Sequence, residues 1–322
     1  MRPLLALALT VIPMFAIDGS GPSAEIHNKA VTAKIFLPDP EKGYYRGTRF
    51  DWSGNTYSLK TKNHEYFGQW FPKYDPKLHD AIMGPVEEFR SADGGLGYDL
   101  AKPGETFVRI GVGVVKRIDD KPYQTFQTYD IVDHGKWKVK TRRGRIQFTH
   151  ELKGPNGYAY RYVKTMRLVG NEARLVIEHE LKNTGKRKIE TQQYNHNFFV
   201  IDGQQTGPGL TVQFPFELKN QRPLRGDAGA ISGGQISYTK ALETGQTFFG
   251  EFAGSSKASD YDITIENQKA KAGVRVKGDR PVSRLVYWSI KTVFSPELYI
   301  DLAVEPGKST KWAYTYDFYD LP

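Results

Sequence analysis

Residues 189–199 have the sequence Ile-Glu-Thr-Gln-Gln-Tyr-Asn-His-Asn-Phe-Phe. In a β-strand successive side chains point to opposite faces, so Gln192, Tyr194 and His196 share one face and the intervening amides share the other. A sandwich strand normally gives one face to an apolar core, whereas both faces of this segment are polar. Aromatic rings stack on sugars while amides and imidazole bond hydroxyls. The segment therefore predicts either a carbohydrate site or a hydrogen-bonded structural network.

The hydrophobic pattern on either side of this segment also has a period of two. Residues 106–116 place valine and isoleucine at alternate positions, which predicts one half-buried strand. A helix is conceivable only over residues 76–89, where Pro85 argues against continuity. Turn signals rich in Gly, Asn and Pro separate further predicted strands, which cover residues 158–168, 172–181, 188–200, 246–253, 262–266, 273–276, 284–290, 298–304 and 310–318. This spacing predicts an all-β fold, a large antiparallel β-sandwich.

Composition agrees with many strands joined by tight turns. The 322 residues include 32 Gly and 18 Pro, and 13% of them are aromatic. No linker or repeat divides the chain, so we expect a single domain over residues 25–322. There is no cysteine, which excludes disulfides, thiolate metal ligands and a cysteine nucleophile.

The first 24 residues have the features of a secretory signal peptide. Arg2 precedes an almost unbroken apolar run from Leu4 to Ile17, followed by small residues. An uncleaved first helix is the alternative. No later stretch approaches the roughly 20 apolar residues of a membrane span. We therefore expect an exported protein, periplasmic or secreted, without a membrane span.

The formal net charge is +9, and residues 134–188 contain 15 Lys and Arg against 4 Asp and Glu. Such a surplus raises the local concentration of anions and favours acidic glycans or an anionic cell envelope. A solvated basic face without a partner is equally compatible with it. No nucleic-acid motif is present, so we do not expect nucleic acid as a partner.

Several motifs occur in an order that resembles a known family. The Tyr194–Phe199 segment is similar to the Asn-His-x-x-Phe segment of aldose 1-epimerases, the galactose mutarotases. Gly47–Phe50 resembles an early strand of that family that brings an arginine to the sugar, and Leu78–Gly84 resembles the stretch with its second histidine. Glu305–Lys308 resembles its closing hairpin. The resemblance implies the galactose mutarotase-like β-sandwich.

The resemblance also implies roles for particular residues. His196 would protonate the ring oxygen of the sugar, while Arg49 and His79 would hold the substrate. An imidazole can both give and take a proton near neutral pH. A hydrogen-bonded structural histidine is the alternative for both His196 and His79.

The general base departs from the family pattern. The family has a glutamate on the penultimate strand, where this chain has Val286–Lys291 without a carboxylate. Glu297 is the nearest substitute, in a segment expected to be an exposed loop. Glu87 and Glu88 are further candidates, and since neighbours on a strand face opposite ways, only one of them could serve.

Other polar residues receive simpler interpretations. His179 alternates with aliphatic residues and is expected to be buried and hydrogen-bonded. Lys116 and Lys164 are surface residues unless they reach the cleft. The histidines show no metal spacing, so no metal site is expected, and nothing indicates a cofactor. The candidate substrate-binding residues are Arg49, Tyr194, Gln192, Glu88, Trp288 and Lys116.

Three functions remain open at this point. The first is an isomerase resembling aldose 1-epimerase, with His196, Glu297 and His79 as catalytic residues. The second is a non-catalytic carbohydrate-binding protein, which the missing glutamate favours. The third is a polysaccharide lyase acting on acidic glycans, with Tyr194 and His196 as acid and base. We expect a mono- or oligosaccharide ligand and a monomeric protein.

Overall fold

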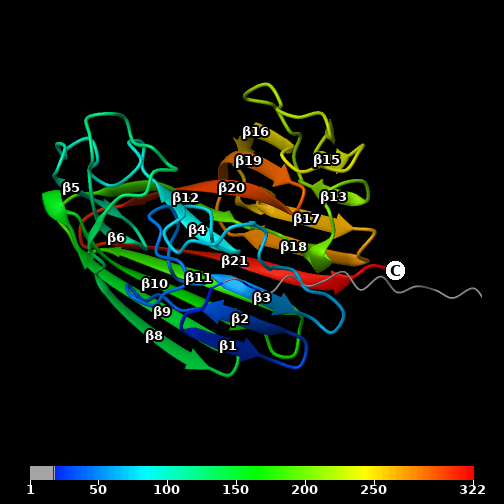
Figure 1. Ribbon diagram of the computed structural model, residues 1–322, viewed down its shortest axis with the longest axis horizontal. Helices are drawn as coiled ribbons and strands as arrows, with labels where there is room; N and C mark the ends of the chain where they lie inside the picture. The colour runs from blue at the N-terminus through cyan, green and yellow to red at the C-terminus, as the bar shows by residue number, and fades with distance from the viewer. Residues whose placement is uncertain (1–16, 18) are drawn as a thin grey trace, which may run out of the picture.

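The computed structural model describes residue 17 and residues 19–322. Most of the expected signal peptide therefore lies outside the described residues. Figure 1 shows the long strands running alongside one another in curved layers. All strand pairs in the two larger sheets are antiparallel. The predicted all-β sandwich is thus confirmed.

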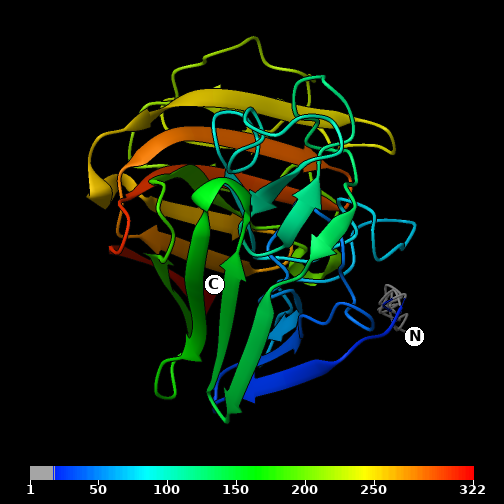
Figure 2. The same ribbon diagram turned by 90° about the vertical axis from the view of Figure 1, so that its left-hand side faces the viewer.

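The larger sheet has ten strands, in the spatial order β14 (Gly229–Ser232), β15 (Gln235–Tyr238), β13 (Leu210–Gln213), β17 (Asp262–Asn267), β18 (Ala272–Gly278), β21 (Ser309–Asp320), β11 (Arg174–Asn183), β10 (Ala159–Leu168), β9 (Arg145–Lys153) and β8 (Lys136–Arg142). The second sheet has five strands, in the order β16 (Thr247–Ser255), β19 (Val282–Ile290), β20 (Val293–Val304), β12 (Ile189–His196) and β4 (Val86–Arg90). Figure 2 shows the strong curvature of the layers, with the strands around residues 136–183 in green at the front.

Two small sheets and three short helical turns complete the described chain. They are β1 (Ser23–His27), β2 (Thr32–Phe36) and β3 (Thr56–Lys60); β5 (Thr106–Arg109), β6 (Gly113–Lys116) and β7 (Ile131–Asp133); and the 3-10 turns η1 (Pro155–Gly157), η2 (Ile201–Gly203) and η3 (Ala258–Asp260). In the described part of the chain no helix has the length and apolarity needed to cross a bilayer. Residues 76–89 contain no helix; turns lead there into β4.

The main hydrophobic core lies between the two larger sheets. It joins Ile177 and Tyr316 of the ten-stranded sheet to Ile300 and Leu302 of β20. These residues alternate along their strands with residues on the opposite face, as the period of two requires. The core holds β12 and β20 in place, and both strands carry site residues.

One strand prediction is wrong. The valine and isoleucine pattern of residues 106–116 predicts a single strand, but the chain reverses within it and β5 pairs antiparallel with β6. Gly111 lies in the turn with φ = 77°, a conformation that suits glycine because it has no Cβ. The apolar residues of the turn are buried, so their spacing imitates a continuous strand.

Candidate active site

The site begins where β12 separates from β20. Their pairing is continuous up to Gln193 and resumes, in the same register, at an isolated bridge between Phe199 and Phe294. In that register His196 lies opposite Glu297. The segment predicted to be an exposed loop around Glu297 is therefore the interior of β20, and Glu297 is buried with 4% exposure.

Local chemistry explains the interruption of the pairing. Pro296 has no N–H to donate to a neighbouring strand, and its carbonyl accepts a hydrogen bond from the Asn197 side chain at 2.7 Å. The Asn197 backbone N–H donates to Ser295 Oγ at 3.0 Å. Phe198 has φ = 43°, which is uncommon for a bulky residue and typical of functional sites.

His196 and Glu297 form a buried pair. His196 Nε2 lies 3.1 Å from Glu297 Oε1, and within the described structure His196 Nδ1 has no hydrogen-bond partner. Burial, followed by the nearby Arg49 charge, lowers the pKa of His196 well below its usual value. Burial raises the pKa of Glu297 to about 8. At neutral pH the pair therefore consists of a neutral imidazole beside a protonated carboxyl group.

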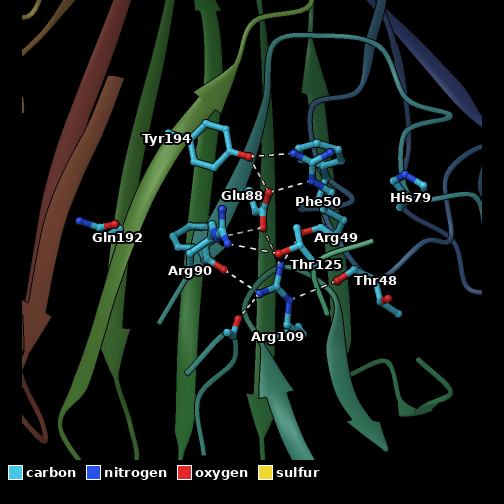
Figure 3. A network of polar contacts seen from close by, with 12 residues as sticks. Thr48, Arg49, Phe50, His79, Glu88, Arg90, Arg109, Thr125, Gln192 and Tyr194 are labelled. Atoms are coloured by element: carbon cyan, nitrogen blue, oxygen red, sulfur yellow. Dashed lines mark hydrogen bonds and ion pairs between the residues drawn. The ribbon is translucent and has the colours of Figure 1, made fainter. Parts of the chain in front are cut away.

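Arg49 is the centre of a polar network beside this pair (Figure 3). Its Nε donates to Glu88 Oε2 at 2.9 Å, and its Nη2 donates to the Tyr194 hydroxyl at 3.2 Å. The Tyr194 hydroxyl donates in turn to Glu88 Oε2 at 2.5 Å. Arg49 Nη1 donates to Asp80. The guanidinium is thus held from three sides in one orientation.

Glu88 is fully buried and compensated by several cations. Besides Arg49, Arg109 Nη2 lies 3.5 Å and Arg90 Nε 3.7 Å from its Oε1. Burial opposes ionisation of Glu88, but these three guanidinium groups lower its pKa. Glu88 is therefore ionised and positions Arg49.

His79 and Asp80 lie on the connection between β3 and β4. His79 Nε2 is 3.0 Å from Asp80 Oδ2. Burial alone would raise the pKa of Asp80, but Arg49 and His79 together outweigh this effect and lower that pKa to about 2. Asp80 lines the cleft, and the His79 ring lies 5.0 Å from that of Phe126.

These groups open into a cleft of about 380 Å³ that is rich in aromatic side chains. Phe126 is 62% exposed and lies 5.0 Å from the Arg49 guanidinium. The His196 ring stacks on Phe198 with 3.6 Å between centroids, and it meets Trp288 edge-on at 5.6 Å. Exposed rings next to hydrogen-bonding groups are the features that recognise a sugar.

The predicted site residues are only partly brought together. Arg49, His196, Trp288 and Glu297 line the cleft, while Tyr194 and Glu88 lie behind Arg49 and His79 lies behind Asp80.

Two predicted substrate-binding residues lie elsewhere. Gln192 is on the same face of β12 as Tyr194, but it is nearer the start of the strand and its amide donates to Asp301 at 2.8 Å. Figure 3 shows it turned away from the network. Lys116 is exposed at the end of β6 and is not among the residues that line the cleft. Their assignment to the cleft is therefore not supported by their positions.

Several cleft residues have no clear signal in the sequence. Asp80 could have been found from its place next to His79. The arginines of the cleft rim come from segments without a recognisable motif, and Arg222 and Arg225 lie in a stretch without strand alternation. The lining residues not predicted include Asp80, Arg90, Arg222, Arg225, Glu251 and Arg284.

Glu87 faces away from the cleft, into a buried cluster between the sheets. It forms an ion pair with Lys164, and His179 Nε2 lies 3.0 Å from its Oε1. Lys164 Nζ is also 3.5 Å from Asp51 Oδ2. The side chains of all four residues are fully buried. The prediction of Lys164 as a surface residue is therefore wrong, whereas His179 is buried and hydrogen-bonded as expected.

Among the described residues no group of three or more His, Asp and Glu side chains is arranged to hold a metal ion.

Comparisons with known proteins find similarity only at the level of structure. No protein-family model matches the chain, and a search of curated proteins finds no match. The Slr1438 protein from Synechocystis sp. PCC 6803 is 14% identical, and the alignment covers 96% of this chain and 100% of that one with a TM-score of 0.57. The GalM/aldose epimerase homologue from C. elegans is 12% identical, with 94% and 100% covered and a TM-score of 0.56.

A galactose mutarotase-like protein from Clostridium acetobutylicum is 12% identical, with 92% of this chain and 95% of that chain covered and a TM-score of 0.55. At such low identity the similarity shows the fold alone. The chain has the galactose mutarotase-like fold, which confirms at this level the resemblance drawn from the sequence motifs.

Proposed function

We propose that the protein is an isomerase of the aldose 1-epimerase type, which interconverts the anomers of a mono- or oligosaccharide. The observation that carries the proposal is the His196–Glu297 pair, with 3.1 Å between Nε2 and Oε1 in an aromatic cleft. The fold of the similar structures supports it by analogy, but a fold does not determine a function.

The reaction needs one proton acceptor and one proton donor at neighbouring atoms. Ring opening removes the proton of the anomeric hydroxyl, forms the carbonyl, breaks the bond from the anomeric carbon to the ring oxygen and protonates that oxygen. Both oxygens are bonded to the same carbon, so an acceptor and a donor side by side can reach them together. His196 and Glu297 have this arrangement.

The protonation states of the pair set the starting roles. Because burial leaves the imidazole neutral and the carboxyl protonated, His196 takes the hydroxyl proton and Glu297 protonates the ring oxygen. The family resemblance implies the opposite starting roles, with His196 as the acid. After the aldehyde rotates, ring closure exchanges the roles and restores the initial pair, so each residue serves as acid once and as base once.

Arg49 and Asp80 are suited to orient the sugar. Arg49 is fixed by Glu88 and Tyr194, and Asp80 is ionised. One therefore offers hydrogen-bond donors and the other acceptors to sugar hydroxyls. Phe126 and Trp288 supply rings for stacking on the apolar faces of the sugar.

The test is exchange spectroscopy by NMR, which follows magnetisation transfer between anomers of common aldoses. We expect acceleration by the wild-type protein and a loss of about 100-fold or more in His196→Ala, since general acid–base catalysis typically contributes this much. His27→Ala removes a histidine of β1 that is 43% exposed and should retain the wild-type rate. Absence of exchange with every aldose would contradict the proposal.

A non-catalytic carbohydrate-binding protein is the second candidate, and one observation favours it. His196 Nε2 and Glu297 Oε1 face each other at 3.1 Å, so a sugar that binds without coming between them would not be turned over. Calorimetry that shows binding without anomer exchange would establish this alternative. A lyase using Tyr194 is disfavoured, because Tyr194 is fully buried and its hydroxyl donates to Glu88.

A further inference from the structure

The rim of the cleft is rich in arginine. Arg222, Arg225 and Arg284 line it together with Arg90 and with Arg49 of the catalytic region. A neutral sugar needs hydrogen-bond donors, but it does not need this concentration of positive charge. The charge is therefore the feature of the site that the proposed isomerase chemistry leaves unexplained.

The carboxylates near the rim do not balance it. Glu251 is shared between Arg222, at 3.2 Å from Nε, and Arg284, at 3.4 Å from Nη1. Counting Glu88 and Asp80 as well, three carboxylates face the five cleft arginines, and Glu88 is also in contact with Arg109. Arginines therefore outnumber the carboxylates that face them around the cleft.

Arg225 is the cation without an internal counter-charge. In the described part of the chain its side chain makes no ion pair or hydrogen bond, and its guanidinium lies 5.1 Å from the centre of the Phe249 ring. Its backbone is fixed nevertheless: Arg225 N–H donates to Phe249 O at 3.0 Å, and Phe249 N–H donates back at 2.9 Å. The cation is thus anchored at the cleft and available to a ligand.

We propose that the cleft selects a sugar that carries an anionic group, a carboxylate or a phosphate monoester, and that Arg225, Arg222 and Arg284 bind this group. The planar guanidinium matches both anions through paired N–H donors. This inference rests on the proposed function, because it names the substrate class of the same cleft. It does not require lyase chemistry.

The experiment compares matched sugars in the anomer-exchange assay. Galactose, galacturonate and galactose 6-phosphate form one series, and glucose, glucuronate and glucose 6-phosphate form the other. We expect at least one anionic form to exceed its neutral parent about tenfold in kcat/KM. In Arg225→Ala the ratio of anionic to neutral should fall at least fivefold, because a charge-assisted contact is lost.

Matched controls separate this contact from a general field effect. Lys140→Ala removes an exposed positive charge on β8 and should keep the ratio. Arg225→Lys retains the charge without the paired donors, so its ratio of anionic to neutral sugar should lie between those of the wild type and Arg225→Ala. The carboxylate and phosphate members show which anion is preferred. A wild-type ratio of one or less, or a ratio unaffected by Arg225→Ala, would overturn the proposal.

Calorimetry with the same sugars distinguishes this inference from the proposed function. If no sugar shows exchange but an anionic sugar binds, and Arg225→Ala weakens that binding, the isomerase proposal fails and the anionic ligand class stands. If neutral and anionic sugars exchange equally, the isomerase stands and the inference of an anionic group fails.

Discussion

His196 and Glu297 show how burial changes the meaning of two common residues. In water an imidazole and a carboxylic acid differ in pKa so that the carboxylate holds the charge near neutral pH. Here both side chains are at most 6% exposed, and burial disfavours the charged form of each. The neutral pair is the result, and it supplies a donor and an acceptor without net charge.

The raised pKa of Glu297 gives a prediction about stability. In the folded protein the pKa of Glu297 is about 8, whereas an unperturbed glutamate has a pKa of 4.5. Between these values ionisation favours the unfolded chain, so stability falls as pH rises, by at most about 1.4 kcal/mol per pH unit from this group. The glutamine in Glu297→Gln cannot ionise, so the free energy of unfolding of this variant relative to the wild type should increase from pH 5 to pH 8.

Urea unfolding at several pH values measures this difference. Glu217→Gln changes an exposed glutamate and serves as the control for general effects of charge. A difference between wild type and Glu297→Gln that stays constant across the range would show that Glu297 is not held in its protonated form.

At the scale of the element, β12 separates two kinds of polar residue on its two faces. Tyr194 and His196 face the network and the cleft. On the other face, Asn195 donates from its side chain to the Tyr316 hydroxyl at 2.8 Å, and that hydroxyl donates to Asn197 Oδ1 at 2.8 Å. The sequence left open whether this segment is a ligand site or a structural network, and the strand has one on each face.

This separation predicts different effects for two tyrosine substitutions. Tyr194→Phe removes the hydroxyl that joins Glu88 to Arg49, so sugar affinity should fall several-fold. Tyr316→Phe leaves Asn195 and Asn197 without their buried partner and should cost about 1–3 kcal/mol of stability with unchanged affinity. Calorimetry and urea unfolding measure the two quantities. Loss of sugar affinity in Tyr316→Phe would contradict the separation of the faces.

The success of strand prediction depended on what surrounds each element. Regions such as 158–168 and 310–318 gave clear alternation because one face of β10 and β21 packs into the core. Residues 106–116 failed because their turn is itself buried. Residues 294–299 suggested a loop because of Pro296, which β20 accommodates where β12 has moved away.

Candidate site residues were predictable only where a motif surrounded them. His196 and Arg49 lie in recognisable segments, and Glu297 was found by the search for a missing carboxylate. Arg222 and Arg225 are brought to the cleft by tertiary contacts with β16. No local sequence pattern encodes such contacts. Gln192 lies on the same face of β12 as Tyr194 and His196, as predicted, but that face extends beyond the cleft.

At the scale of the whole molecule, the two large sheets are joined by buried charges as well as by the apolar core. Glu87 comes from the five-stranded sheet, and Lys164 and His179 come from the ten-stranded sheet. Burial raises the pKa of Asp51 to about 6, while at Glu87 the contacts with Lys164 and His179 together outweigh burial and lower the pKa. The cluster therefore ties the layers together through Lys164.

Removal of that lysine should be costly. Lys164→Met leaves Asp51 and Glu87 without their buried cation, and we expect a loss of about 3–5 kcal/mol of unfolding free energy. Adding Glu87→Gln to this variant should recover part of the loss, and a double-mutant cycle by urea unfolding measures the coupling. Lys140→Met, on the exposed face of β8, is the matched control. A loss below about 1 kcal/mol in Lys164→Met would contradict this role.

The attachment of Arg225 to Phe249 has a consequence for the solubility of the molecule. Strand β16 is the outer strand of its sheet, and such an edge is a template for pairing with other chains. Residues 219–225 cover part of it, with backbone hydrogen bonds from Gln221 and Arg225 to β16 and a proline in between. Because residues 219–225 cover this edge, we expect their shortening to promote aggregation, so engineering of the cleft's specificity should exchange side chains and leave the length of this segment intact.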